Sequence, residues 1–245
     1  MMKKILSLLL LCGLSATTVF GQKTYKKEAF DLFRNGRILE WTGIIDSLKA
    51  EPDRTLDQNV ELLVYYYGLV GHLMGIDKKQ SRELLDAAMP VIKPLLESNP
   101  DDARLLGLMA NFNGYAIALS PLKATTLGRT MMQQARRTPQ LAPESPEANI
   151  WGANILFYMP NALGGNTKQS IEYYRKALDL YENDESLRED NWMYLQVIIT
   201  LGLVEEKQEN YEAALSYYEK AMQLYPEYPH VKEVLRPRVL EKINK

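Results

Sequence analysis

The side chains best suited to metal binding or proton transfer are few in this chain. It has two histidines, His72 and His230, and one cysteine, Cys12. Zinc sites need several such ligands at short, regular spacing, as in HExxH or CxxC, and neither pattern occurs. His72 lies between Leu69 and Leu73 in an apolar stretch, which favours a hydrogen-bonded histidine in a groove or core. His230 is expected on the surface, and no metal site is predicted.

Carboxylate pairs and a double glycine are the other groups that could take part in catalysis. Asp101-Asp102 and Glu205-Glu206 are adjacent in sequence, and adjacent residues on a helix point to different faces, so neither forms a working acid–base pair. Gly164-Gly165 lacks the lysine spacing of a phosphate loop, and a turn is favoured there. No nucleophile with a base and an orienting group is visible. We therefore predict no catalytic residue and no cofactor, and a hydrolase is the least favoured of three hypotheses.

Aromatic and basic side chains offer another kind of chemistry, the binding of a partner. The aromatic residues could form a binding surface, although packing between helices is the favoured role for most of them. The basic residues are expected to be a solvated surface, which an acidic segment of a partner could also use. These candidates are Tyr65-Tyr66-Tyr67, Tyr115, Trp151 and Trp192, with the basic residues Lys123, Arg129, Arg136 and Arg137.

The whole chain has the composition of an ordinary globular protein. It has 245 residues, of which 46% are hydrophobic and 24% are charged, and its net charge is −2. It is not basic enough to suggest a nucleic-acid partner, and it is not polar enough to suggest disorder. The length is ample for a sizeable hydrophobic core.

Residues 1–21 are predicted to be a secretory signal peptide. Lys3-Lys4 precede the apolar run Ile5–Leu14, and Val19-Phe20-Gly21 suits cleavage before Gln22. The apolar run is about half of the roughly 20 residues that span a bilayer, so no stable membrane span is expected after processing. Removal of the two lysines changes the net charge from −2 to −2 − 2 = −4. An exported, periplasmic protein is therefore expected.

Cys12 leaves an alternative open, an outer-membrane lipoprotein anchored through this cysteine. It follows Leu9-Leu10-Leu11, whereas a small residue usually precedes a lipid-modified cysteine. If Gln22 is instead the first residue of the processed protein, no cysteine is left and disulfides are excluded.

The elements that must position the candidate side chains repeat along the chain. The stretch Gly164–Tyr181 returns as Gln208–Pro226, with Tyr173-Tyr174 matching Tyr217-Tyr218. Self-similarity at this period indicates stacked helical repeats, and prolines 52, 100, 143 and 226 mark the ends of second helices. The predicted helix–turn–helix units are 24–52, 55–100, 101–143, 146–183 and 187–226, with a capping helix at 230–243.

Three local features refine these units. Asn166-Thr167 are predicted to cap the helix that contains Tyr173-Tyr174. Pro90 and Pro94 lie inside the helix expected at 78–98, and an interior proline costs about 3 kcal/mol, so a kink or a break is predicted near Met89. In the third unit, a loop to about Leu127 is expected before a helix at 128–140.

The last unit resembles the tetratricopeptide repeat, a helix–turn–helix of about 34 residues. The residues that carry this resemblance are Leu201-Gly202, Tyr211, Ala214, Tyr218, Ala221 and Pro226. The fourth unit matches in its second helix through Gly165, Ser170, Tyr174 and Ala177, but it is longer, and the turn Pro160–Gly165 holds much of the surplus. The first three units match in their ends and in their helix pairing.

This resemblance implies an all-α fold, a right-handed α-solenoid of about five elongated repeats over residues 22–245 with a C-terminal capping helix. Small residues such as Ala177 and Ala221 would let paired helices approach closely, and a large replacement should overpack the contact by about 1–3 kcal/mol. The long units with Pro-x-x-x-Gly-Gly are also similar to the periplasmic repeat component associated with TRAP transporters.

In the family, the first helices line a concave groove that usually binds peptides. The register counted from the repeat residues places eight side chains on that face, and buried hydrogen bonding to a neighbouring turn is the alternative role for the polar ones. They are Tyr65, His72, Asn111, Tyr115, Asn149, Gln196, Ile199 and Leu203.

Two hypotheses of different classes follow. The favoured one is a non-enzymatic scaffold or adaptor that holds a protein or peptide in the groove, which is an inference from fold to function. The alternative is a small-molecule-binding component that serves a periplasmic transporter. A closed apolar pocket lined by Tyr65, Asn111 and Tyr115 would favour the small molecule, and an open groove along several repeats would favour the peptide.

Overall fold

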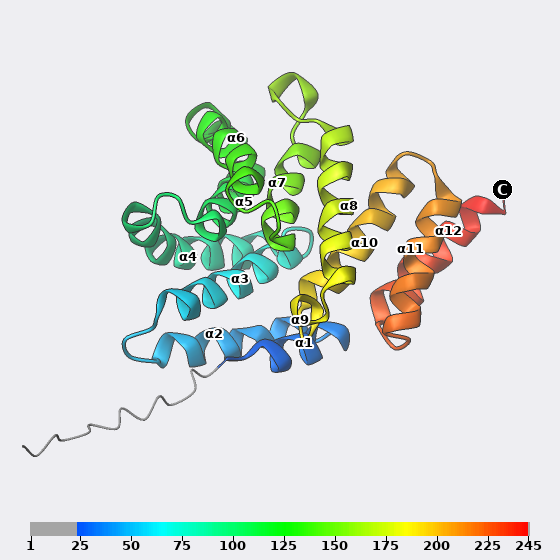
Figure 1. Ribbon diagram of the computed structural model, residues 1–245, viewed down its shortest axis with the longest axis horizontal. Helices are drawn as coiled ribbons and strands as arrows, with labels where there is room; N and C mark the ends of the chain where they lie inside the picture. Colours follow the sequence, from blue (N-terminus) through cyan, green and yellow to red (C-terminus); the bar gives the residue numbers. More distant parts are fainter. Residues whose placement is uncertain (1–23, 245) are drawn as a thin grey trace, which may run out of the picture.

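The computed structural model describes residues 24–244, so the predicted signal peptide and Cys12 lie outside the described residues. Within this range the regular elements are α-helices with short 3-10 and π-helical turns, and none is a strand. The all-α repeat fold predicted from the sequence is confirmed. Antiparallel helix pairs follow one another along the chain (Figure 1).

Four of these pairs form the repeat array. They are α3 (Leu56–Leu73) with α4 (Lys78–Ser98), α5 (Ala103–Leu119) with α6 (Ala124–Leu141), α7 (Pro146–Tyr158) with α8 (Thr167–Asn183), and α10 (Trp192–Lys207) with α11 (Tyr211–Leu224). α3 packs on α5, α5 on α7, and α8 on α10. A short helix, α9 (Glu185–Arg188), lies in the connection before α10.

Polar side chains fix where several helices begin. Thr55 and Gln58 form a capping box at the start of α3, and the side chain of Asp102 accepts from the backbone N–H groups of Arg104 and Leu105. The Asn166 side chain accepts from Gln169 N at the start of α8, as the sequence predicts.

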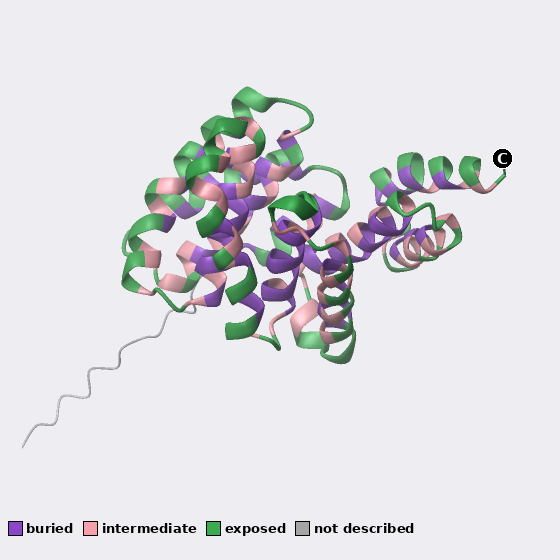
Figure 2. Cartoon of the chain, turned by 90° about the horizontal axis from the view of Figure 1, so that it is seen from above, coloured by how far each residue is buried: buried purple, intermediate pink, exposed green. Residues whose placement is uncertain are grey.

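Small residues set the distance between paired helices. Ala177 and Ala221 have no exposed surface. A Cβ atom added at Gly202 in α10 would lie 2.4 Å from Tyr218 Cε1 in α11, and one added at Gly107 in α5 would lie 2.5 Å from Trp151 Cε3 in α7. These contacts are possible because the helix backbones approach closely where no side chain intervenes. The buried residues accordingly line the inside of the helix pairs (Figure 2).

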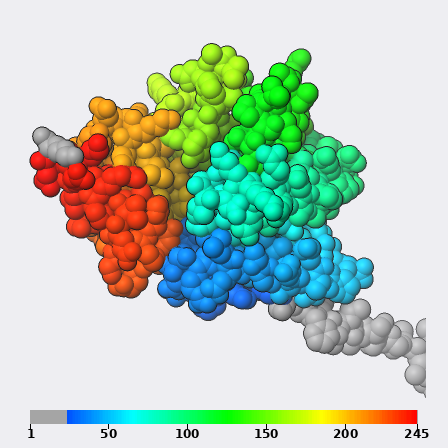
Figure 3. Space-filling view, turned by 180° about the vertical axis from the view of Figure 1, so that it is seen from behind, coloured from blue at the N-terminus to red at the C-terminus, as the bar shows by residue number. Residues whose placement is uncertain are grey.

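The first pair does more than begin the array. α1 (Lys26–Arg34) and α2 (Trp41–Ala50) are joined by the 3-10 turn Ile38–Glu40, α2 packs on α3, and α1 packs on α10. Phe33 in α1 contacts both Trp192 of α10 and Tyr228, with ring centroids 5.3 and 5.5 Å apart. The first unit therefore connects the second unit with the last, and the C-terminal segment lies against the N-terminal helices (Figure 3).

A terminal element covers the last repeat. The π-helical turn His230–Leu235 leads into α12 (Arg236–Ile243), which packs on α11. Val231, Leu235 and Val239 are buried there. The element shields the apolar side of the last pair, as a capping helix does in a solenoid.

One local prediction is wrong in part and another is wrong. The break predicted near Met89 does not occur, because α4 runs from Lys78 to Ser98 with Pro90 and Pro94 on its exposed side, where water can bind the carbonyl groups that lose a helix N–H. The kink that was the other outcome predicted there stays a prediction. α6 begins at Ala124 rather than after Leu127, because the 3-10 turn Pro121–Lys123 leads directly into it.

Candidate functional site on the inner face

Side chains from the first helices of successive pairs meet in one polar and aromatic cluster. Tyr67 of α3 stacks on Tyr115 of α5, with ring centroids 5.9 Å apart. Asn154 of α7 bonds to the Tyr67 hydroxyl, and Tyr174 of α8 bonds to Asn154. We call Tyr67, Tyr115, Tyr158 and Tyr174, with Asn111 and Asn154, the tyrosine cluster. The inner face is the side of α3, α5 and α7 that carries this cluster, together with the end of α10 next to it.

Two backbone carbonyls fix the direction of the hydrogen bonds in this cluster. Asn111 Nδ2 donates to the carbonyl oxygens of Gly107 at 2.8 Å and Trp151 at 3.1 Å, so its Oδ1 is left to accept. That oxygen accepts from Asn154 Nδ2 at 3.0 Å. The orientation of the first amide therefore determines the orientation of the second.

The orientation of the Asn154 amide also determines whether each tyrosine hydroxyl beside it donates or accepts. Asn154 Oδ1 accepts from the Tyr174 hydroxyl at 2.7 Å, while its Nδ2 donates to the Tyr67 hydroxyl at 2.8 Å. Because the Tyr67 oxygen accepts this bond, its own proton is left for another acceptor. The relay thus ends at Tyr67 with a donor next to Tyr115.

Burial keeps these phenols protonated. It raises the pKa of Tyr67, Tyr115 and Tyr174 above the ordinary value of 10.0, and the nearby Tyr158 hydroxyl raises each of them further. Tyr158 itself is 72% exposed and Tyr115 is half-buried, so the cluster opens to solvent at these two residues. It can donate hydrogen bonds to a ligand, and it supplies no base at neutral pH.

The inner face continues from the cluster to the last pair. Phe157 packs edge to face on Tyr174, and Lys207 Nζ at the end of α10 lies 4.5 Å from the centre of the Phe157 ring. Lys207 and Leu203 line a shallow depression of about 230 Å³ with Glu206 and Arg238. Aromatic, amide and basic groups therefore follow one another from α5 to α10.

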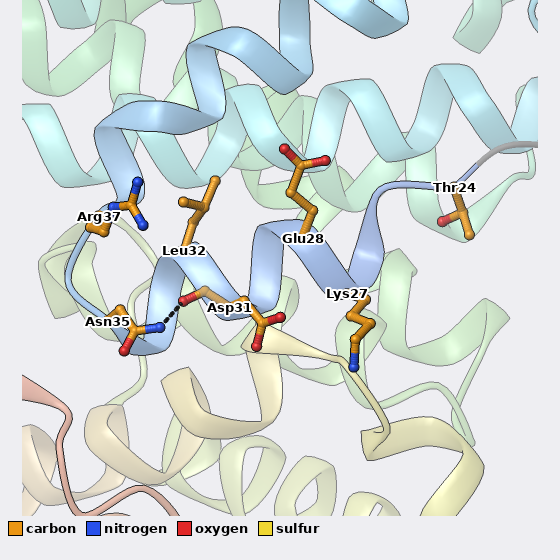
Figure 4. A pocket seen from close by; sticks show the side chains of 7 residues that line it. All are labelled: Thr24, Lys27, Glu28, Asp31, Leu32, Asn35 and Arg37. Atoms are coloured by element: carbon orange, nitrogen blue, oxygen red, sulfur yellow. Dashed lines mark hydrogen bonds between the residues drawn. The ribbon is translucent and has the colours of Figure 1, made fainter.

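A second depression, of about 440 Å³, lies around α1. Lys27 and Glu28 project from opposite sides of the helix, and the Asn35 side chain bonds to the carbonyl of Asp31 (Figure 4). The polar groups of this depression do not converge on one point, so it lacks the features of a binding site.

The structure brings some of the predicted groove residues together and separates others. Asn111 and Tyr115 both belong to the tyrosine cluster, and Leu203 lines the depression beside Lys207. Gln196 is half-buried one turn before Thr200, whose hydroxyl it contacts. A binding role for these residues stays a prediction.

The other four lie elsewhere. Tyr65 is buried against Trp41 and donates to Glu61 at 2.7 Å, so it does not share a pocket with Asn111 and Tyr115. Asn149 is buried and donates to the carbonyls of Pro143 and Ser145. This is buried hydrogen bonding to a neighbouring turn, the alternative role expected for the polar residues of the predicted groove. Ile199 is buried in the core, and His72 is exposed at the end of α3.

Sequence reasoning missed Asn154, Tyr174 and Lys207 as members of this face. A signal was present for Asn154, because it is the one amide in the otherwise apolar run 150–158 of α7. In the described residues no group of three or more His, Cys, Asp or Glu side chains could hold a metal ion. No described helix is both long and apolar enough to cross a bilayer.

The fold and the inner face define a helical repeat protein whose first helices present one continuous surface. The tetratricopeptide repeat family matches residues 196–228 and 164–184, which are the units with the clearest repeat residues. These two segments are similar to tetratricopeptide repeats, which are typically modules of protein interaction.

One solved structure shares the fold at low sequence identity, and another matches more weakly. A structure described as the HusA haemophore from Porphyromonas gingivalis is 15% identical with a TM-score of 0.58, covering 74% of this chain and 90% of that one. A crystal structure of MamA is 17% identical with a TM-score of 0.41, covering 69% and 90%. Comparison of the sequence with curated proteins gives no match.

Proposed function

We propose that this protein is an exported, non-enzymatic scaffold that holds a segment of a partner protein against its inner face. The observation that carries the proposal is the run of exposed or half-buried binding groups from Tyr115 through Tyr158 to Lys207 across three repeats. The two depressions described above are shallow and open, which favours an extended segment over a small enclosed molecule.

The chemistry of the inner face defines what such a segment would offer. Tyr115, half-buried beside Tyr67, can offer its phenolic hydroxyl, and a backbone carbonyl or a carboxylate is the matching group. The exposed ring of Tyr158 offers a flat apolar contact, and Lys207 offers a positive charge. A segment with an aromatic or aliphatic anchor next to an acidic residue fits these three groups.

The experiment is a selection followed by a matched comparison. Peptides are selected from a random display library on the processed protein, and their Kd is measured by fluorescence anisotropy. We expect Tyr158→Ala and Lys207→Ala each to weaken binding by roughly tenfold, as for an interface anchor. The control is Leu39→Ala, which removes an exposed side chain from the first unit, and it should leave Kd unchanged. Equal Kd values for all variants would contradict the proposal.

A second candidate is the binding of a small planar molecule. It is favoured by the fold that this chain shares with a protein described as a haemophore, together with the tyrosine cluster. Stacking on Tyr158 and Tyr115 would hold such a ligand at the open side of the cluster. Titration with haemin, followed by its visible absorbance, tests it; saturable binding that Tyr115→Ala abolishes and Leu39→Ala preserves would favour this candidate.

Export is part of the proposal and has its own test. Fractionation of the native cell should recover the protein from the periplasm, starting at Gln22 by mass spectrometry. A Cys12→Ala variant separates the alternatives, because a lipoprotein would lose its membrane anchor and a processed soluble protein would be unaffected.

A further inference from the structure

The most exposed large apolar side chains of the described residues gather at one kind of turn. Leu122 is 85% exposed, Tyr158 72%, Ile76 70% and Leu163 61%, and the other exposed large hydrophobic residues are at 51% or below. All four lie at or beside the turns that join the first helix of a pair to its second helix. Ile76 is in the α3–α4 turn, Leu122 in the α5–α6 turn, and Leu163 in the α7–α8 turn.

These three turns lie along the same side of the repeat array. In these three antiparallel pairs, α3 packs on α5 and α5 packs on α7, so the corresponding turns follow one another. A contact across pairs agrees with this order. Arg82, near the start of α4, donates to the carbonyl of Leu119 at the end of α5.

Lysines accompany the apolar tips. Lys78 and Lys79 follow Ile76, Lys123 follows Leu122, and Lys168 stands at the start of α8 after Leu163; all four are exposed. The one acidic residue within these turns, Asp77, caps α4 by accepting from the backbone N–H groups of Lys79 and Gln80. We call Ile76, Leu122, Leu163 and the four lysines the lysine rim.

The opposite side of the array carries the opposite charge. There the turns that lead from each second helix to the next first helix are rich in carboxylates and have no apolar tip of comparable exposure. Their acidic residues include Glu51, Asp53, Asp101, Asp102, Glu144, Asp184, Glu185, Glu189 and Asp190. The first three pairs of the array are thus polarised, with a basic and apolar rim on one side and acidic turns on the other, whereas the α10–α11 turn carries Glu209 and no apolar tip.

We propose that the lysine rim docks the protein on the surface of a bilayer that contains anionic phospholipid. The lysines would face the phosphate groups, and the separate apolar tips would enter the boundary between headgroups and acyl chains. The acidic rim would be repelled by the same surface, which sets the orientation. This attachment is peripheral and requires no membrane-spanning helix.

Charge complementarity favours lipid over an acidic protein as the occupant. The tips are single side chains on three separate turns, and neither depression described above lies among them, so a partner helix has no groove to fill. The cations are lysines, which act as hydrated point charges and lack the planar fork with which arginine binds a fixed carboxylate. A fluid surface of phosphates suits both features.

The test is cosedimentation of the processed chain, beginning at Gln22, with vesicles of phosphatidylcholine alone or mixed with phosphatidylglycerol. We expect binding to the mixed vesicles, little binding to the neutral ones, and loss of binding as salt is raised. One variant replaces Ile76, Leu122 and Leu163 with Ser, and another replaces Lys78, Lys79, Lys123 and Lys168 with Gln. Each should weaken binding at least roughly tenfold, because several contacts are lost together.

Matched controls remove the same groups from other places. One replaces the exposed residues Leu39, Leu224 and Val234 with Ser, and the other replaces the exposed lysines 27, 49, 93 and 242 with Gln. Both should bind like the unaltered chain. All of these side chains are exposed, and circular dichroism checks that each variant is folded.

Two results would overturn the proposal. One is binding that does not depend on phosphatidylglycerol, or that the controls reduce as much as the rim variants do. The other is failure to bind any vesicle while polyglutamate binds through the same four lysines, which would assign the rim to an acidic protein. Tyr158 is left unaltered throughout, so the result does not depend on the proposed peptide site.

Discussion

Trp192 of α10 packs edge to face against Trp41 of α2, with ring centroids 5.1 Å apart and an interplanar angle of 65°. Trp41 has no exposed surface and also donates through its indole N–H to the carbonyl of Ala29. This pair joins the first unit to the last, so the repeats are held by contacts between distant units as well as between neighbours. A simple solenoid would have neighbour contacts alone.

The first prediction concerns this closure. Trp41→Ala should lower the free energy of unfolding by about 3–5 kcal/mol, because it removes a fully buried aromatic side chain and leaves a cavity. Urea unfolding followed by circular dichroism measures the change. Leu39→Ala, at a residue that is 51% exposed in the same unit, should alter stability by no more than about 0.5 kcal/mol. Equal effects of the two substitutions would mean that the closure contributes nothing.

The sequence allowed the helices to be predicted but not this closure. Pairing between neighbouring helices follows from local periodicity and proline positions, and the fold agrees. The contact of α1 with α10 joins the two ends of the chain, and no local pattern signals it. The same limit applies to Tyr65-Tyr66-Tyr67. Three consecutive residues point to more than half of the directions around a helix, so their spacing could not show that Tyr67, and not Tyr65, faces the tyrosine cluster.

The second prediction compares two glycines. Gly202→Ala should destabilise the protein by about 1–3 kcal/mol, because the new methyl group would overlap the ring of Tyr218. Gly43→Ala has nothing within 4 Å of the added atom. It should raise stability by up to about 1 kcal/mol, since alanine is the better helix former. Thermal unfolding of the two variants should therefore shift in opposite directions, and shifts of the same sign would refute the close-approach argument.

The third prediction tests the hydrogen-bond relay. Asn154→Leu removes bonds to Asn111, Tyr67 and Tyr174 and should cost about 1–3 kcal/mol, because the partners are left unsatisfied. Combining it with Tyr174→Phe gives a double-mutant cycle, and we expect a coupling of at least about 0.5 kcal/mol. Additive effects would show that the two side chains do not interact. Gln133→Ala, an exposed amide on α6, is the control and should be neutral.

The fourth prediction concerns alkaline pH. Burial raises the pKa of Tyr228 from 10.0 to about 12, so above pH 10 the unfolded chain loses this proton while the folded chain retains it. The contribution is complete below pH 10 and is lost as pH rises towards 12, at about 1.4 kcal/mol per pH unit. Tyr228→Phe should therefore make the fall of stability above pH 10 less steep in urea titrations. Parallel curves for the two proteins would contradict the assignment.

The last prediction returns to the two prolines of α4. Both lie on the exposed side of an unbroken helix, so the carbonyls of Asp86 and Pro90, which lose a helix N–H, can bond to water instead of being unsatisfied in the core. Pro90→Ala restores an N–H to the helix without touching the core, and it should stabilise the protein by about 1–3 kcal/mol even after the gain in unfolded-state entropy. Ala88→Pro places the same ring on the buried face and should unfold the pair α3–α4. Urea unfolding followed by circular dichroism measures the stability of both variants. If Ala88→Pro changed stability no more than Pro90→Ala does, the position of the prolines on the exposed side would not explain why α4 is continuous.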